Sequence, residues 1–135
     1  MRIVFVDTFF WIARIDKHDQ WHQRAKEIGD SLADSTLLTT EAVLVELLNY
    51  FSAYGPELRQ AAVQIVYQLL NNSRIEVLDQ TRASLIAGLK LFEARSDKEY
   101  SLTDCLSMQA MRERGLTEVL THDHHFAQEG FILLL

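Results

Sequence analysis

The sequence predicts an α/β fold in which helices flank a parallel sheet of about five strands. Short β-branched and aromatic runs have the composition of buried strands, at residues 3–6, 36–40, 75–78, 118–121 and 131–134. Longer stretches with apolar residues at helical spacing separate them. Strands that alternate with helices favour a parallel, helix-covered sheet. The chain contains no repeat, low-complexity tract or linker, so we expect one domain over residues 1–135.

Helices are expected at residues 9–15, 18–32, 41–54, 56–71, 81–94 and 101–115. Gly55 ends one of them and Pro56 opens the next, because proline suits the first position of a helix. Turn residues at 71–73 end that helix. The last helix begins at a capping residue, Ser101 or Thr103, and stops at Gly115.

The charge of the chain limits how it could bind nucleic acid. There are 13 Lys plus Arg against 19 Asp plus Glu, a net charge of −6. This balance argues against broad coating of nucleic acid, which usually requires a basic surface. It allows a short substrate to approach bound metal, because two divalent ions would offset about four of the negative charges.

Cellular location is predicted from three features. Cys105 is the only cysteine, so no intramolecular disulfide forms, and we expect it to be buried in a helix. Asp7 interrupts the first apolar run before a secretory signal could form. No stretch approaches the roughly 18 apolar residues of a membrane span. We therefore expect a soluble, cytoplasmic protein with no membrane partner.

Four acids, Asp7, Glu46, Asp104 and Asp123, stand in otherwise apolar or uncharged surroundings. Asp7 and Asp123 sit where strands should end, the edge at which parallel sheets bind ligands. Each acid also has a purely structural explanation. Asp7 could cap a helix, Glu46 could be solvated at the edge of an apolar face, and Asp104 could complete a capping box with Ser101. Jointly, they form a set of hard oxygen ligands suited to Mg²⁺ or Mn²⁺.

Three histidines around Asp123 suggest zinc as an alternative: His122, His124 and His125. On an extended segment, adjacent side chains point to opposite faces, so only some of them could share one ion. No second cysteine and no HExxH helix completes such a site. Solvation, partner contact and substrate positioning are the favoured interpretations of these histidines.

Four strings in the sequence resemble the PIN-domain ribonucleases, in particular the VapC-like toxins: IVFVDTFFWIA, LTTEAVLVELLNYF, YSLTDCLSMQAMRERG and EVLTHDHHFAQEGF. The resemblance spans the chain in the family's order and spacing. It implies a PIN-like, five-stranded sheet with an acidic pocket that binds Mg²⁺ or Mn²⁺. It places the catalytic and metal-binding acids at Asp7, Glu46, Asp104 and Asp123. The supporting residues that it implies are Thr8, Thr121 and Asp97.

The function that this resemblance implies is a metal-dependent endoribonuclease. RNA phosphodiester bonds would be hydrolysed through a Mg²⁺- or Mn²⁺-activated water to leave a 5′-phosphate, with Asp104 or Glu46 as the base. The implied setting is a toxin paired with a small antitoxin, and we expect a homodimer. No substrate-binding residue is identified; basic residues that could hold phosphates are Arg14, Lys17, Arg95, Lys98, Arg112 and Arg114.

Other functions compete with this one. A haloacid-dehalogenase-type phosphatase needs a second Asp two residues after its nucleophile, where this chain has Phe9. A response-regulator receiver needs an acidic pair at its first strand, which is also absent. A free-standing nuclease in RNA processing and a non-catalytic binding module stay open. Phe10, Trp11 and Trp21 are either core residues or a face for a dimer or antitoxin.

Overall fold

The computed structural model describes all 135 residues, and they are arranged around one parallel sheet. Its strands are β1 (Ile3–Val6), β2 (Thr36–Thr40), β3 (Ile75–Leu78), β4 (Glu118–Leu120) and β5 (Ile132–Leu133). The strand order is β3–β2–β1–β4–β5, and every neighbouring pair is parallel. The predicted fold class, a five-stranded parallel sheet flanked by helices, is confirmed.

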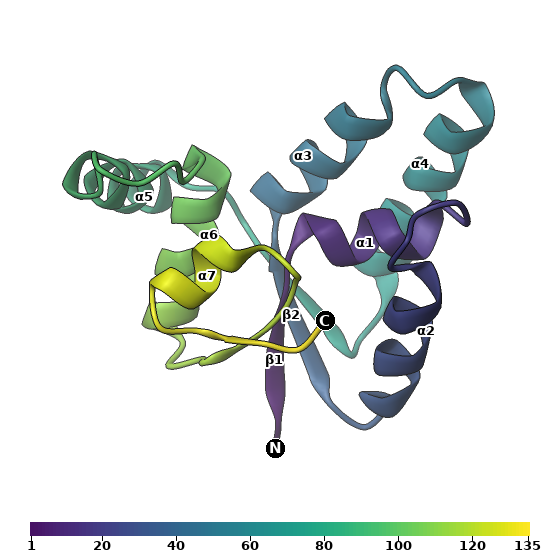
Figure 1. The fold of residues 1–135 in the computed structure, drawn as a ribbon, viewed down its shortest axis with the longest axis horizontal. Coiled ribbons are helices and arrows are strands. Elements are labelled where there is room, and N and C mark those ends of the chain that lie inside the picture. Colours follow the sequence, from purple (N-terminus) through teal and green to yellow (C-terminus); the bar gives the residue numbers. More distant parts are fainter.

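Helices cover both faces of this sheet. They are α1 (Thr8–Ile15), α2 (His22–Ser31), α3 (Glu41–Phe51), α4 (Pro56–Asn71), α5 (Arg82–Ala94), α6 (Leu102–Glu113) and α7 (His124–Gln128). Figure 1 shows α1 to α4 on one side of β1 and β2, and α5 to α7 on the other. None of these helices has the length and apolar character needed to cross a membrane.

Most element boundaries match the sequence prediction, and the differences have local causes. α2 begins at His22 rather than His18, because the side chains of Asp16 and Asp19 hydrogen bond to backbone N–H groups two residues on. These bonds hold the connection after α1 as turns. α3 ends at Phe51, three residues earlier than predicted. α7 was not predicted at all, and it lies at the site described below.

The hydrophobic core forms one continuous cluster around β1, whose Val4, Phe5 and Val6 are completely buried. Phe10 and Trp11 belong to this core, with exposed fractions of 2% and 6%. The alternative that they are core residues is therefore correct for both, and Phe10 faces Gly29 of α2. Trp21, the third residue considered for a dimer or antitoxin face, is partly buried and packs against the same core. Cys105 is also buried as predicted, and burial raises the pKa of its thiol to about 11.

A glycine allows α5 and α6 to approach closely. A Cβ built on Gly88 would lie 2.5 Å from Leu106 Cδ2 and 3.4 Å from Leu106 Cα. The missing side chain therefore lets α6 pack directly against α5. Since α6 carries Asp104 in its first turn, this contact helps to fix where that acid lies.

Candidate active site

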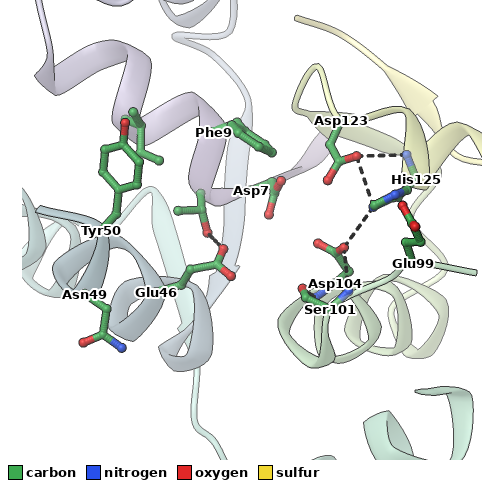
Figure 2. A pocket seen from close by; sticks show the side chains of 12 residues that line it. Asp7, Phe9, Glu46, Asn49, Tyr50, Glu99, Ser101, Asp104, Asp123 and His125 are labelled. Atoms are coloured by element: carbon green, nitrogen blue, oxygen red, sulfur yellow. Dashed lines mark hydrogen bonds and ion pairs between the residues drawn. The ribbon is translucent and has the colours of Figure 1, made fainter. Parts of the chain in front are cut away.

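A cleft of about 610 Å³ opens at the carboxyl ends of β1 and β4. Its lining comes from α1, α3, α6, α7 and the segments that precede α6 and α7. The residues around it are Asp7, Thr8, Phe9, Ile12, Glu46, Asn49, Tyr50, Glu99, Ser101, Asp104, Asp123 and His125. All four predicted acids are therefore brought together, and Figure 2 shows their carboxylates facing a common space.

Asp7 lies at the base of this cleft, directly after β1, and is 2% exposed. Although it occupies the cap position of α1, its side chain makes no capping hydrogen bond. Instead, the hydroxyl of Thr121 donates to Asp7 Oδ2 at 2.9 Å. Asp7 Oδ1 is buried and has no hydrogen-bond partner. The capping interpretation of Asp7 therefore does not explain its side chain.

Glu46 reaches the cleft from the middle of α3, where it is half-buried. The hydroxyl of Thr8, in the first turn of α1, donates a short hydrogen bond to Glu46 Oε1. This contact ties α3 to the end of β1 and turns the carboxylate inwards. The sequence also allowed Glu46 to be a freely solvated side chain at the edge of an apolar face. Its half-buried position and its bond with Thr8 exclude that alternative.

Asp104 serves the helix and the cleft at the same time. Its backbone N–H donates to the Ser101 hydroxyl at 3.0 Å, and its Oδ2 accepts from the Ser101 backbone N–H at 3.1 Å. This is the capping box expected from the sequence. The same carboxylate faces the cleft, with Oδ2 lying 3.3 Å from His125 Nδ1. The structural and functional interpretations of Asp104 are therefore compatible.

Asp123 caps α7, the helix that was not predicted. Its Oδ1 accepts from the backbone N–H of His125 at 3.0 Å, and its own backbone N–H donates to the Thr121 hydroxyl at 3.1 Å. Its Oδ1 also lies 3.4 Å from His125 Nδ1. Thr121 thus connects Asp7 with Asp123. His125 connects Asp123 with Asp104 (Figure 2).

The electrostatics of the cleft oppose ionisation of three of its acids, Asp7, Glu46 and Asp104. Burial, together with the charge of Asp104, raises the pKa of Asp7 to about 8. The pKa of Glu46 and that of Asp104 are also raised, in both cases mainly by burial. No Lys or Arg lines the cleft or forms an ion pair with any of these carboxylates. A buried group of acids without a counter-charge is costly unless protons or a cation neutralise it.

The supporting residues implied by the resemblance divide into two groups. Thr8 and Thr121 each hydrogen bond to a cleft acid. Asp97 is not brought to the cleft: its side chain is 73% exposed and lies 3.7 Å from Lys98 Nζ. Glu99, two residues further on, lines the cleft in its place.

Three of the arginines considered for phosphate binding are already paired. Arg95 and Arg112 both bind Glu129, and Arg114 binds Glu76. None of the six basic candidates lines the cleft. The lining residues that the sequence prediction did not assign to the site are Phe9, Ile12, Asn49, Tyr50, Glu99 and Ser101. His125 was considered for substrate positioning, but its contact with the acids was not predicted. His125 had one available signal, its position beside Asp123 on a segment rich in histidine.

His122 lies apart from the other two histidines, but the expectation that adjacent histidines point to opposite faces is wrong for His124 and His125, whose ring centroids are 4.7 Å apart. His122 stacks on Trp21 with ring centroids 4.7 Å apart, whereas His124 points outwards with a 75% exposed side chain. His124 and His125 are helical rather than extended, which corrects the predicted geometry. Ligand atoms of Asp123, His124 and His125 lie within 4.8 Å of one another. Two of these three residues, Asp123 and His125, also line the acidic cleft, so an ion bound by this group would lie at the edge of that cleft.

Comparison with known proteins identifies the family. The family model described as "PIN domain" matches residues 4–131, and this chain belongs to the PIN-domain family. The chain is 28% identical over 134 residues to the 23S rRNA-specific endonuclease VapC20 of Mycobacterium tuberculosis, with 96% of each covered. The resemblance drawn from the sequence to PIN-domain, VapC-like proteins is therefore confirmed.

Solved structures agree with this assignment. The crystal structure of Mycobacterium tuberculosis VapC20, described as a sarcin–ricin loop cleaving toxin, superposes with a TM-score of 0.86 at 26% identity and 96% coverage of each chain. VapBC2 from Rickettsia felis, bound to a DNA fragment from its promoter, gives a TM-score of 0.67 at 20% identity. It covers 98% of this chain and 97% of that one, and this likeness concerns the fold alone.

Proposed function

We propose that this chain is a divalent-metal-dependent endoribonuclease, the toxin of a toxin–antitoxin pair, and that Asp7, Glu46, Asp104 and Asp123 form its active site. The observation that carries the proposal is the buried, unpartnered Oδ1 of Asp7, in a cleft with three further carboxylates and no Lys or Arg. Such an atom is costly unless a ligand satisfies it. A hard divalent cation supplies both the missing partner and the missing positive charge.

The relatives support the choice of reaction. VapC20, which aligns over nearly the whole chain, is named a 23S rRNA-specific endonuclease and described as a toxin. Carried over to this chain, these descriptions indicate RNA as the substrate and a neutralising antitoxin as a partner. The same acidic cleft would suit this role, since enzymes that cleave phosphodiesters commonly use divalent ions held by carboxylates.

The chain's own residues would each have a defined role. The four carboxylates would hold one or two Mg²⁺ or Mn²⁺ ions, and those ions would supply Lewis acidity and an activated water for attack on phosphorus. Thr121 fixes the rotamer of Asp7, and Thr8 fixes that of Glu46. His125 contacts Asp104 and Asp123 and so keeps these two acids on the same side of the cleft. One of the acids would also take a proton from the attacking water, and Glu46 and Asp104 are the two candidates. In Glu46 only Oε1 accepts the hydrogen bond from Thr8, so Oε2 is available for this role.

The net charge of the protein suits a reaction that starts only after cation binding. The net charge of −6 opposes the approach of RNA, and the carboxylates of the cleft oppose it locally as well. Neutralising the cleft removes that local repulsion where the phosphate must approach. RNA binding and cation binding should therefore be coupled.

The proposal is tested by incubating the purified chain with labelled RNA and Mn²⁺ or Mg²⁺, with and without EDTA. We expect endonucleolytic cleavage that EDTA abolishes and that Asp7→Asn and Asp104→Asn each reduce by at least about 100-fold. Asp97→Asn is the matched control, because it removes an acid of the same type outside the cleft. Cleavage that persists in EDTA would refute the metal-dependent mechanism. Full activity of a purified Asp7→Asn variant, free of contaminating ribonuclease, would refute it as well.

A further inference from the structure

The cleft has two chemically different walls, and only one of them carries the acids that pair with His125. Asp104 and Asp123 lie on the side formed by α6 and α7. Phe9 and Tyr50 lie on the side formed by α1 and α3, across Asp7 from His125 (Figure 2). We call Phe9 and Tyr50 the aromatic wall. Both are 38% exposed, although large apolar rings in a core would be covered.

Tyr50 is held in place by other aromatic rings. The ring of Tyr54 stacks on it with centroids 4.9 Å apart and an interplanar angle of 18°, and the two hydroxyls are 3.3 Å apart. Phe51, which is fully buried, packs edge-on against it at 5.0 Å. The hydrogen bond with Tyr54, together with burial, raises the pKa of Tyr50 to about 12. A tyrosine is already neutral at physiological pH with its ordinary pKa of about 10, so this phenol does not repel phosphate.

Phe9 has a comparable support. Its ring lies 4.5 Å from that of His122, which in turn stacks on Trp21 at 4.7 Å with an interplanar angle of 13°. This column joins α1, the start of α2 and the segment after β4. Both rings of the aromatic wall are thus fixed before any ligand arrives, so binding to them costs little side-chain entropy.

We propose that the aromatic wall binds unstacked RNA bases next to the phosphodiester that is cleaved. This inference rests on the proposed function. A ribonuclease must hold its substrate, but no Lys or Arg lines this cleft to grip phosphates. Stacking of bases on exposed aromatic rings is the alternative means of holding single-stranded RNA, and it tolerates an acidic surface because it does not depend on charge.

The proposal restricts the substrate to RNA whose bases are free at the cleavage point. In a regular duplex, each base face is covered by its neighbours, and an aromatic side chain cannot reach it. The wall therefore selects loops, bulges and single strands. Asn49 is exposed on the same side of the cleft, where its amide could meet the edge of a stacked base.

The first test measures cleavage of a single-stranded RNA by the full chain with Mn²⁺. Tyr50→Leu and Phe9→Leu keep apolar volume but remove the ring, and each should raise KM by about 10-fold or more with a smaller change in kcat. Tyr50→Phe keeps the ring and should stay within about twofold of the wild type. Tyr67→Leu is the matched control, because Tyr67 is an exposed tyrosine on α4 that does not line the cleft.

The second test reads base stacking directly. RNA carrying the fluorescent base 2-aminopurine is titrated with the Asp104→Asn chain at a Mn²⁺ concentration that calorimetry shows to saturate this variant, so that binding is observed without rapid cleavage. We expect quenching on binding that Tyr50→Leu removes in the same background, and weaker binding of the RNA after annealing to its complement.

The outcomes separate the two proposals. If the wild type cleaves no RNA, the proposed function fails and the base-binding role falls with it. If the wild type cleaves RNA but the leucine variants retain KM and quenching, the base-binding role alone is wrong, and the aromatic wall serves a protein partner or the fold. If Tyr50→Leu lowers the melting temperature substantially, Phe9→Leu and the quenching measurement at low temperature decide between binding and stability.

Discussion

The hydroxyl of Thr121 donates a hydrogen bond to Asp7 Oδ2 across 114 positions of sequence, while Oδ1 of the same buried carboxylate accepts none. The same hydroxyl accepts the backbone N–H of Asp123. One threonine thus fixes the geometry of two acids that come from the ends of neighbouring strands. It leaves one oxygen at the base of the cleft free for a ligand.

Asp7→Asn should stabilise the protein when no divalent cation is present. Burial and the charge of Asp104 raise the pKa of Asp7 to about 8, so its ionised form costs stability in the folded state. An amide of the same shape removes that cost, and we expect the free energy of unfolding to rise by about 1–3 kcal/mol above pH 8. Thermal unfolding in EDTA measures this. The same variant should lose the rise in melting temperature that Mn²⁺ gives to the wild type, whereas Asp97→Asn should keep it.

The cation-free protein should become less stable as the pH rises from about 5 to about 8. The pKa values of Asp7, Glu46 and Asp104 are all raised on folding. A group of this kind contributes stability that is complete below its unfolded pKa, about 4, and that is lost as the pH passes through its folded pKa. Urea denaturation at several pH values in EDTA measures the trend. An equally steep decline in Asp7→Asn would contradict the assignment to Asp7.

Saturating Mn²⁺ should reverse this pH trend. Cation binding requires deprotonated carboxylates, so the apparent affinity rises with pH over the same interval in which the cation-free protein weakens. Stability measured in excess Mn²⁺ should therefore hold steady or increase between about pH 5 and about pH 8. Identical curves in Mn²⁺ and EDTA would mean that the cleft does not bind the ion.

Thr121→Val should weaken both folding and cation binding. The substitution keeps the shape but leaves Asp7 Oδ2 and the Asp123 backbone N–H without their partner, a loss of about 1–3 kcal/mol. Because Asp7 and Asp123 lose their alignment, Mn²⁺ affinity should fall by about 10-fold or more. Thr39→Val is the control: Thr39 is equally buried, and its hydroxyl donates to the Val6 carbonyl outside the acid cluster. Thr39→Val should lower stability without the same loss of affinity, as calorimetry can show.

Gly88→Ala should destabilise the contact between α5 and α6. The added Cβ would meet Leu106 at 2.5 Å, and we expect a loss of about 1–3 kcal/mol in the free energy of unfolding. Gly29→Ala is a matched control in α2, where the Cβ would meet the mobile end of Arg14 at 2.7 Å. There the arginine can move aside, and the better helix propensity of alanine should leave stability equal or higher by up to about 1 kcal/mol. Equal losses in both variants would show that helix packing at Gly88 is not special.

The sequence contained enough to find the strands and the four acids. Asp7 and Asp123 follow strand-like runs, and parallel strands bring their carboxyl ends to one edge of a sheet. Glu46 and Asp104 are placed by helical periodicity and by a capping pattern. These are local signals, and the structure brings all four residues to one cleft. Their roles in metal binding and catalysis stay predictions until the experiments above are done.

What the sequence could not show depends on contacts between distant segments. α7 is only five residues long, and Asp123, which caps it, was interpreted as the residue after a strand and as a metal ligand, not as the start of a helix. Glu99 and Asp97 lie in an irregular connection, where no periodicity indicates which acid turns inwards. Hydrophobicity likewise could not tell Phe10, which is buried, from its neighbour Phe9, which faces the cleft.

The position of β1 between β2 and β4 has a consequence for the order of folding. Phe5 pairs with Leu38 in a nearby segment but with Val119 in a remote one, so the second pairing closes a far longer loop. Long loops are slow to close, and helices form much earlier. Ribonuclease activity should therefore emerge late in refolding, when β4 docks, so that a newly made chain is harmless until its last strands are in place.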